Sequence, residues 1–132
     1  IEISNDTNWQ KNHWKAIESA YSSSPYFEHY EIEIKNLIFN DEINLINFNN
    51  KIYRTIAQWL GIMTHVSITT EFNLELNKEL DFRNQFDKNN KIDKNTFTKY
   101  NQVFENEIGF IPNLSILDAI FALGPMARKL ID

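Results

Sequence analysis

Residues 9–21 read WQKNHWKAIESAY and place two indoles, a phenol and an imidazole in one amphipathic segment. If the segment is helical, a rotation of about 100° per residue puts Trp9, His13 and Ile17 on one side, together with Ala16 and Ala20. His13 then lies in the middle of an apolar stripe, where burial of an unpaired imidazole is costly. The imidazole is therefore either a hydrogen-bonded core group or a general acid or base at the floor of a pocket.

A second amphipathic helix is expected directly after this one. Ser24 is a suitable N-cap, because its hydroxyl can accept a hydrogen bond from a free N–H group at the start of a helix. Pro25 fits the first helical position, where its missing N–H has no consequence. Apolar residues then recur at spacings of three and four up to about Phe39, which predicts a helix over that range.

The strongest helical pattern lies between a capping residue, Asn40 or Asp41, and Gly61. Its apolar positions follow one face, and a glycine is a common residue just after the end of a helix. On the helical wheel Asn49 falls inside this apolar face. We interpret its amide either as a buried group that bonds to the backbone or to His13, or as a ligand contact.

A strand and a last helix complete the expected fold. Residues 62–69 alternate β-branched and polar side chains, which is typical of a strand, and residues 1–3 are its expected partner. A last helix is expected to open at residues 113–115 and to stop at Gly124-Pro125. Its residues from Ile116 to Leu123 are apolar on nearly every side, so this C-terminal helix should be largely buried. The fold class predicted for residues 1–132 is therefore a single mainly helical α+β domain, with amphipathic helices packed around the buried C-terminal helix and a small two-stranded element.

Composition excludes several classes of function. The chain of 132 residues has a net charge of −5, with 13 basic and 18 acidic side chains, so it offers no basic stripe for nucleic acid or an anionic membrane. It has no cysteine and only three scattered histidines, which argues against a metal site. It contains no apolar run long enough to span a membrane and no glycine-rich phosphate loop, so no cofactor is predicted. A cytoplasmic location is expected.

Ser115 and Asp118 are separated by three positions at the start of the last predicted helix. This spacing favours a capping box, in which Ser115 caps the helix and Asp118 reaches back to its N–H. A Ser-His-Asp hydrolase is disfavoured, because no nucleophile elbow accompanies the serine. Asp81 and Arg83 form either an ion pair with one another or a clamp that binds a polar substrate. Gln102, among aromatic residues, is either a sugar contact or a loop amide.

The order of these blocks resembles the WbqC-like family of bacterial proteins. The resemblance rests on WQKNHWKAI at 9–17, AY at 20–21, SPYF at 24–27, FN at 48–49, LGI at 60–62, DFR at 81–83, YNQVF at 100–104, GFIPNLSILD at 109–118 and GP at 124–125. Members of this family begin with a further segment that contains a Gln-Pro-rich strand motif. Because the chain opens on Ile1 without that motif, we expect it to lack the amino-terminal part of the family.

The resemblance implies a role in O-antigen and other surface polysaccharide biosynthesis, as a transferase of an aminoacyl or acyl group or as a glycosyl-type transferase, with a sugar or activated sugar as substrate. It carries no settled mechanism. On the positions that match the family blocks, we predict three catalytic residues, with His13 as general base and Asp81 and Arg83 orienting the substrate. The predicted substrate-binding residues are Asn49, Gln102, Asn113, Ser115 and Asp118.

The alternative hypothesis is a binding module without catalytic activity, in which Trp9, Trp14 and Tyr100 line a surface for a sugar or a partner protein. The two hypotheses predict different shapes. A deep pocket that joins His13 to Arg83 favours the transferase, whereas a flat aromatic face favours the module.

Overall fold

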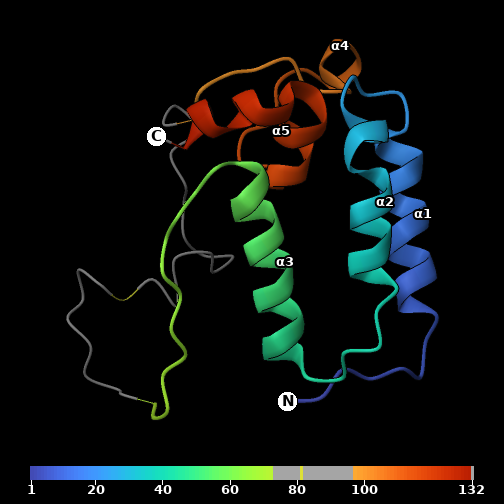
Figure 1. Ribbon diagram of the computed structural model, residues 1–132. Helices are drawn as coiled ribbons and strands as arrows, with labels where there is room; N and C mark the ends of the chain where they lie inside the picture. The colour runs from blue at the N-terminus through green and yellow to red at the C-terminus, as the bar shows by residue number, and fades with distance from the viewer. Residues whose placement is uncertain (73–80, 82–96, 132) are drawn as a thin grey trace.

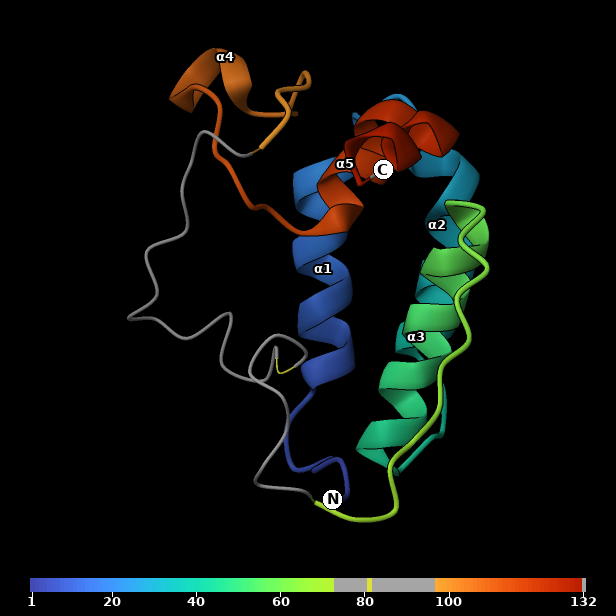
Figure 2. The same cartoon turned by 90° about the vertical axis from the view of Figure 1, so that its left-hand side faces the viewer.

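The computed structural model describes residues 1–72, 81 and 97–131. In chain order their helices are α1 (Trp9–Tyr21), α2 (Phe27–Ile38), α3 (Leu45–Trp59), α4 (Glu105–Ile108), α5 (Ile116–Leu123) and the 3-10 helix η2 (Gly124–Leu130). α1, α2 and α3 run alongside one another, and α5 with η2 lies across one end of the group (Figure 1). A view at right angles shows α1 standing apart from α3, with α5 bridging above them (Figure 2).

The core forms where α5 meets α1 and α2. Ile120 and Phe121 of α5 have no exposed surface, and the ring of Phe121 lies 5.0 Å from that of Tyr21 and 5.2 Å from that of Phe27, between centroids. α2 contributes a continuous buried face that includes Tyr30. The prediction of a buried C-terminal helix is confirmed, because residues 118–121 of α5 are all buried.

The buried face of α1 is rotated from the one expected. Trp14, which the predicted stripe left out, is 6% exposed and packs on Phe27 with 6.2 Å between ring centroids. His13, predicted at the centre of the buried face, is exposed. Trp14, Ile17 and Tyr21 are spaced by three and four residues and share the side that faces the core, which moves His13 to its edge.

The helix starts differ from the predicted ones. α2 begins at Phe27 rather than Pro25, because Ser24 closes the preceding turn: its hydroxyl donates to the carbonyl of Tyr21, and its own carbonyl accepts from the Phe27 N–H. α3 begins after Asn44, whose side-chain oxygen accepts from two free N–H groups at 3.0 and 3.2 Å. Neither Asn40 nor Asp41 is its cap.

Gly61 follows the end of α3, as the sequence predicted, and it has a positive φ of 65°. Its carbonyl accepts a hydrogen bond of 2.6 Å from Nη1 of Arg128 in η2. This contact ties the end of α3 to the other end of the chain. It joins the helix group to η2.

The predicted two-stranded element between residues 1–3 and 62–69 is wrong. No β-strand occurs in the ranges 1–72 and 97–131, and residues 62–69 have no regular structure. Residues 1–3 instead pair with residues 43–45: the Ile3 N–H donates to the Ile43 carbonyl at 2.8 Å, and the Leu45 N–H donates to the Ile1 carbonyl at 3.1 Å. Alternation along 62–69 was insufficient, since a strand also needs a partner to take up its hydrogen bonds.

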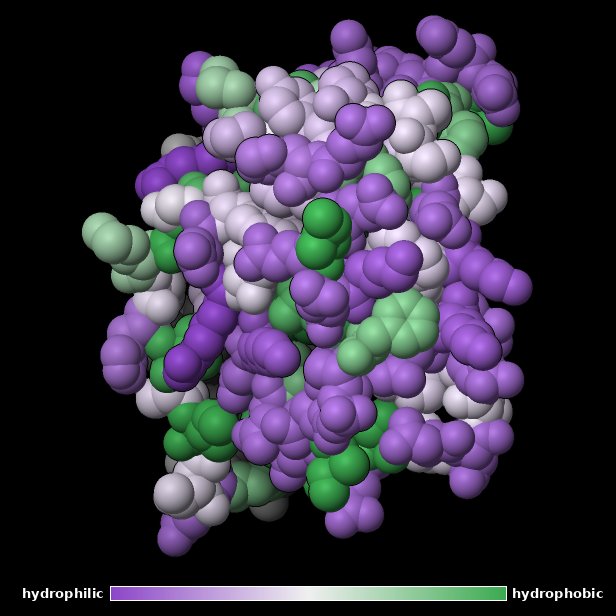
Figure 3. Space-filling view, turned by 45° about the vertical axis from the view of Figure 1, so that its right-hand side comes forward, coloured by the Kyte–Doolittle hydropathy of each residue, from purple (hydrophilic) through white to green (hydrophobic). Residues whose placement is uncertain are grey.

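The surface seen from the side of α1 and α2 is mainly hydrophilic, with separated hydrophobic side chains (Figure 3). None of the helices described is long and apolar enough to cross a membrane. Exposed apolar residues that stand singly are normal for a folded domain and carry no functional meaning by themselves.

Candidate functional site

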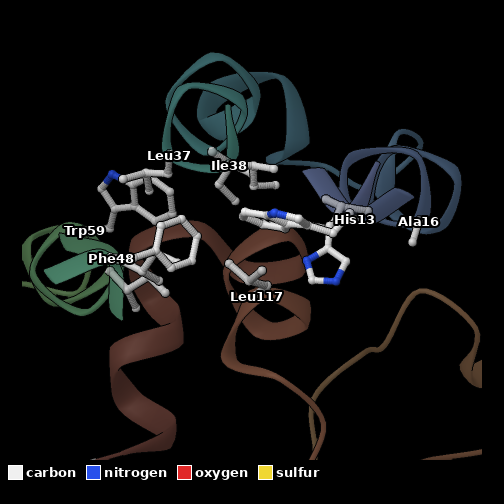
Figure 4. Close-up of a pocket in the computed structure, with 12 residues that line it drawn as sticks. His13, Ala16, Leu37, Ile38, Phe48, Trp59 and Leu117 are labelled. Carbon is white, nitrogen blue, oxygen red and sulfur yellow. The ribbon is translucent and has the colours of Figure 1, made fainter. Parts of the chain in front are cut away.

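An apolar slot of about 360 Å³ lies between α1, α2 and α3 and is closed at one end by Leu117 of α5. Figure 4 shows His13 of α1 on one side of this slot, Trp59 of α3 on the other and Leu37 of α2 between them. The residues lining the slot are Trp9, His13, Ala16, Ile17, Ile34, Leu37, Ile38, Phe48, Ile52, Ile56, Trp59 and Leu117. Apart from one imidazole and the N–H groups of two indoles, these side chains are entirely apolar.

His13 supplies the imidazole of the slot. Its ring meets the indole of Trp9 edge to face, with 5.4 Å between ring centroids. Trp9 in turn meets Phe48 of α3 at 5.6 Å, so two aromatic pairs run from α1 to α3 across this part of the slot. The exposure of His13 leaves its ring open to solvent and to a ligand in the slot. This exposure contradicts the interpretation of His13 as a buried core histidine, and its role as a general acid or base stays a prediction.

Asn49 does not lie in the slot. It is exposed, because the face of α3 that is turned to the slot runs through Phe48, Ile52, Ile56 and Trp59, at spacings of four and three. The interpretation of Asn49 as a buried amide is therefore wrong. The helical period was read correctly, but the centre of the apolar face was placed one residue too far along.

Gln10 has a structural role that the sequence analysis missed. Its Nε2 donates to the carbonyls of Ile38 and Asn40 at 2.9 and 3.0 Å, and so satisfies acceptors at the C-terminal end of α2. The signal was present in the sequence: Gln10 lies on the same face as Trp14, where an amide needs a partner. This bridge fixes α1 against α2.

Asp81 is half-buried, and Arg83 lies outside the described residues. Whether these two charges lie beside the His13 slot, or pair with one another, stays a prediction. The predicted pocket that joins His13 to Arg83 also stays a prediction, because Arg83 lies outside the described residues.

Gln102 joins two parts of the segment between Tyr100 and α5. Its Nε2 donates to the Ile111 carbonyl at 2.7 Å, and its Oε1 accepts from the Ile111 N–H at 2.8 Å. The nitrogen and the oxygen of the amide thus both bond to the backbone of Ile111, and Gln102 is 9% exposed. This geometry is that of the loop amide, one of the two interpretations of Gln102. A hydrogen bond from the Gln102 side chain also lowers the pKa of Tyr100, although burial raises that pKa overall.

Asp118 is the one side chain among the described residues with a buried polar atom that lacks a hydrogen-bond partner. Its side chain is only 2% exposed, and Oδ2 has no hydrogen-bond partner among the described residues. Burial raises the pKa of this carboxyl above 3.8. Burial, and then the nearby charge of Asp118, raise the pKa of Tyr21 above 10.0, and the same charge contributes to the raised pKa of Tyr100. A carboxyl and two phenols are thus gathered around the first turn of α5.

The predicted capping box is only half present. Ser115 is the N-cap of α5, and its hydroxyl oxygen accepts from the Leu117 N–H at 3.4 Å, a long bond. The buried Oδ2 of Asp118 takes no part in capping. Ser115 and Asn113 instead line a second cavity of about 250 Å³ with Tyr100 and Phe110. Asn113 has a positive φ of 59°, which turns the chain into α5.

The aromatic residues of the binding-module hypothesis do not form one face. Trp14 is in the core, Trp9 lines the slot and Tyr100 lines the second cavity. In the ranges 1–72 and 97–131, together with Asp81, no three His, Asp or Glu side chains are grouped so that they could hold a metal ion.

Residues 1–97 match the model of the WbqC-like protein family. The chain belongs to this family. A relative in Mycobacterium tuberculosis (strain ATCC 25618 / H37Rv), named "Uncharacterized protein Rv1507c", is 28% identical over 69 residues, which are 52% of this chain and 30% of the relative. The chain thus matches less than a third of that protein's length. No solved structure matches this WbqC-like chain significantly.

Proposed function

We propose that this WbqC-like chain is part of a cytoplasmic transferase of bacterial surface polysaccharide biosynthesis, with His13 as its general base. The observation that carries the proposal is the position of His13 at the edge of an apolar slot of about 360 Å³. A cavity of this size, with one imidazole and two indole N–H groups among apolar walls, has the usual form of a small-molecule site. An imidazole is the side chain best suited to proton transfer near neutral pH.

The lining of the slot favours acyl transfer over glycosyl transfer. A sugar ring carries hydroxyl groups that lose their hydrogen bonds to water on burial, and the slot walls have few groups to replace them. An acyl chain loses nothing of this kind and gains about 0.8 kcal/mol for each buried methylene group. We therefore place the apolar part of an acyl donor in the slot, with the sugar acceptor outside it.

In this arrangement His13 removes a proton from an acceptor hydroxyl or amine as that group attacks the acyl carbon. The imidazolium then gives the proton to the leaving group of the donor. Asp81 and Arg83 retain their predicted role of orienting the polar part of the substrate. Of the proposed substrate-binding residues, Asn113 and Ser115 line the second cavity. Gln102 and Asp118 are buried and are not part of its lining, and Asn49 is exposed on α3.

The test is the variant His13→Ala in the full-length protein, with glycan modification followed by mass spectrometry in the producing bacterium. We expect modification to be lost while the thermal unfolding temperature changes little, because His13 is exposed. His29→Ala is the matched control, since His29 is an exposed histidine of α2 that does not line the slot. Full modification by a folded His13→Ala protein would show that the assignment is wrong.

A further inference from the structure

Residues 62–70, which we call the strap, belong to no helix or sheet. The strap leaves the end of α3 and runs back along that helix without coiling (Figures 1 and 2). Its start lies against α3, because Ile62 and Thr64 line one cavity of about 420 Å³ together with Ala57 and Gln58. The helix therefore supports the strap from one side.

The backbone of the strap is available for hydrogen bonding. The Ile62 N–H donates to the Ala57 carbonyl at 2.8 Å, but the N–H and C=O groups of residues 63–69 bond to none of the residues that the structure describes. Side chains of the strap are also accessible, since Met63 is 99% exposed and Ile68 is 59% exposed. An extended backbone of this kind can pair with a further strand, as a peptide does when it adds to the free edge of a sheet.

The sequence of the strap, IMTHVSITT, favours such pairing. Positions 62, 64, 66, 68 and 70 are all β-branched, and side chains of this type favour the extended conformation. Free strand edges normally carry charged residues or proline, which discourage pairing with another chain. The strap has neither, although charged side chains make up 23% of the protein. It is therefore an edge without the usual protection against a partner strand.

The symmetry of the pattern favours a second copy of this chain as the partner. In an antiparallel pair related by a twofold axis at Val66, Val66 lies opposite the partner's Val66. Thr64 then lies opposite the partner's Ile68, and Ile62 opposite the partner's Thr70. Every position on this face therefore pairs two β-branched side chains. No like charges meet, because the strap contains no Asp, Glu, Lys or Arg, whereas two copies with a net charge of −5 repel one another elsewhere.

We propose that the strap is a homodimer interface, in which residues 62–70 of two copies pair as antiparallel strands about a twofold axis at Val66. α3 supports each strand, and packing against a helix is what a two-stranded ribbon needs to be stable in water. The pairing gives partners to the backbone groups of residues 63–69. It is independent of the transferase proposal, because Ala57 and Gln58, which meet the strap, do not line the slot.

The test uses the absence of cysteine from the chain, since a single introduced thiol can form a disulfide only with another copy. Directly opposite Cα atoms of antiparallel strands are about 4.5–5.5 Å apart, which is within the span of a disulfide. Val66→Cys should therefore give a covalent dimer when the chain is oxidised with diamide and run on a non-reducing gel. A native chain that stays monomeric in sedimentation equilibrium up to about 1 mM would overturn the proposal.

Ile68→Cys is the matched control for the register. Because Ile68 lies opposite the partner's Thr64, the two copies of position 68 are about 13 Å apart along the strands, too far for a disulfide. Ile68→Cys alone should therefore stay unlinked, whereas a mixture of Thr64→Cys and Ile68→Cys should be linked. Equal linkage of Val66→Cys and Ile68→Cys would indicate random collision of exposed thiols and would count against the interface.

A pair of charged variants tests the twofold axis without a thiol. Val66→Lys places two like charges opposite one another, so its dimer should dissociate at least about tenfold more readily than the native dimer. Val66→Glu should behave in the same way. An equimolar mixture of the two variants should associate again, because opposite charges then meet, and this recovery also shows that both variants fold. Equal association of each variant alone and of the mixture would contradict the proposal.

Discussion

Replacement of Asp118 by Asn should stabilise the protein at neutral pH. The side chain is 2% exposed, and its Oδ2 has no partner among the described residues. A buried polar group without a partner costs about 1–3 kcal/mol, and an ionised one costs more. Asn has nearly the same shape and no charge, but its amide still needs partners. We therefore expect the free energy of unfolding to rise by about 1–2 kcal/mol at pH 7.

The stabilisation by Asp118→Asn should increase as the pH rises. At pH values below 3.8, the ordinary pKa of this carboxyl, Asp118 is protonated in both the folded and the unfolded chain. No buried charge then destabilises the folded state. As the pH rises through 3.8, the unfolded chain releases the proton first, because burial raises the pKa of the folded state. The free energy of unfolding of the native protein therefore falls as the pH rises from 3.8 to the pKa of folded Asp118, and it stays at the lower value above that pH. The difference between Asp118→Asn and the native protein should therefore be small near pH 3.5 and largest near pH 7.

Urea unfolding followed by circular dichroism at several pH values measures this difference. The control is Glu107→Gln, which removes an exposed carboxylate and should leave the free energy of unfolding within about 0.5 kcal/mol of the native value. A native protein more stable than Asp118→Asn at pH 7 would refute the reasoning. So would a difference between them that did not change with pH.

Two further predictions concern the backbone and the joint between α1 and α2. Gly124→Ala should destabilise the protein by about 2–4 kcal/mol in urea unfolding, because φ is +58° there and a new Cβ would lie 2.6 Å from the ring of Tyr26. Gly109→Ala, with φ +74° and open space around it, should cost only about 1 kcal/mol; equal losses would exclude the ring clash. Gln10→Ala should cost about 1–3 kcal/mol, since it removes two hydrogen bonds to the end of α2, whereas Asn12→Ala on the exposed side of α1 should change stability by less than about 0.5 kcal/mol. Similar stabilities of these last two variants would show that the bridge contributes little.

The positions of the helices could be predicted because periodicity depends only on the chain itself. α1, α2 and α3 occur where apolar spacings of three and four predicted helices, and α5 occurs where a continuous apolar run predicted a buried one. The direction of each buried face was less certain, because it depends on what the helix meets. Trp14 packs against Phe27 of the next helix, and with Trp14 on the buried face of α1, His13 lies at the margin of that face and is exposed.

The strand failed for a related reason. Residues 62–69 have a strand pattern, but residues 1–3 bond to residues 43–45 instead, and no local signal decides between two partners. At the site, His13 was identified as an unusual group in α1, whereas its slot required the packing of four helices. Asp118 was assigned to a cap from its spacing alone. Its burial is a property of the packed fold, where its charge acts on Tyr21 and Tyr100, both distant in the sequence.

The joint made by Gln10 also determines how the slot can open. Because that amide bonds to the end of α2, α1 and α2 should move as one body. α3 meets them through aromatic pairs, Trp9 with Phe48 and Tyr30 with Trp59, and through the hydrogen bond from Trp59 to Glu33. Contacts between aromatic rings allow α3 to slide against α1 and α2, whereas the two hydrogen bonds from Gln10 to backbone carbonyls hold α1 and α2 in one position. Local opening should therefore begin at α3, and its amides should exchange with deuterium before those of α2.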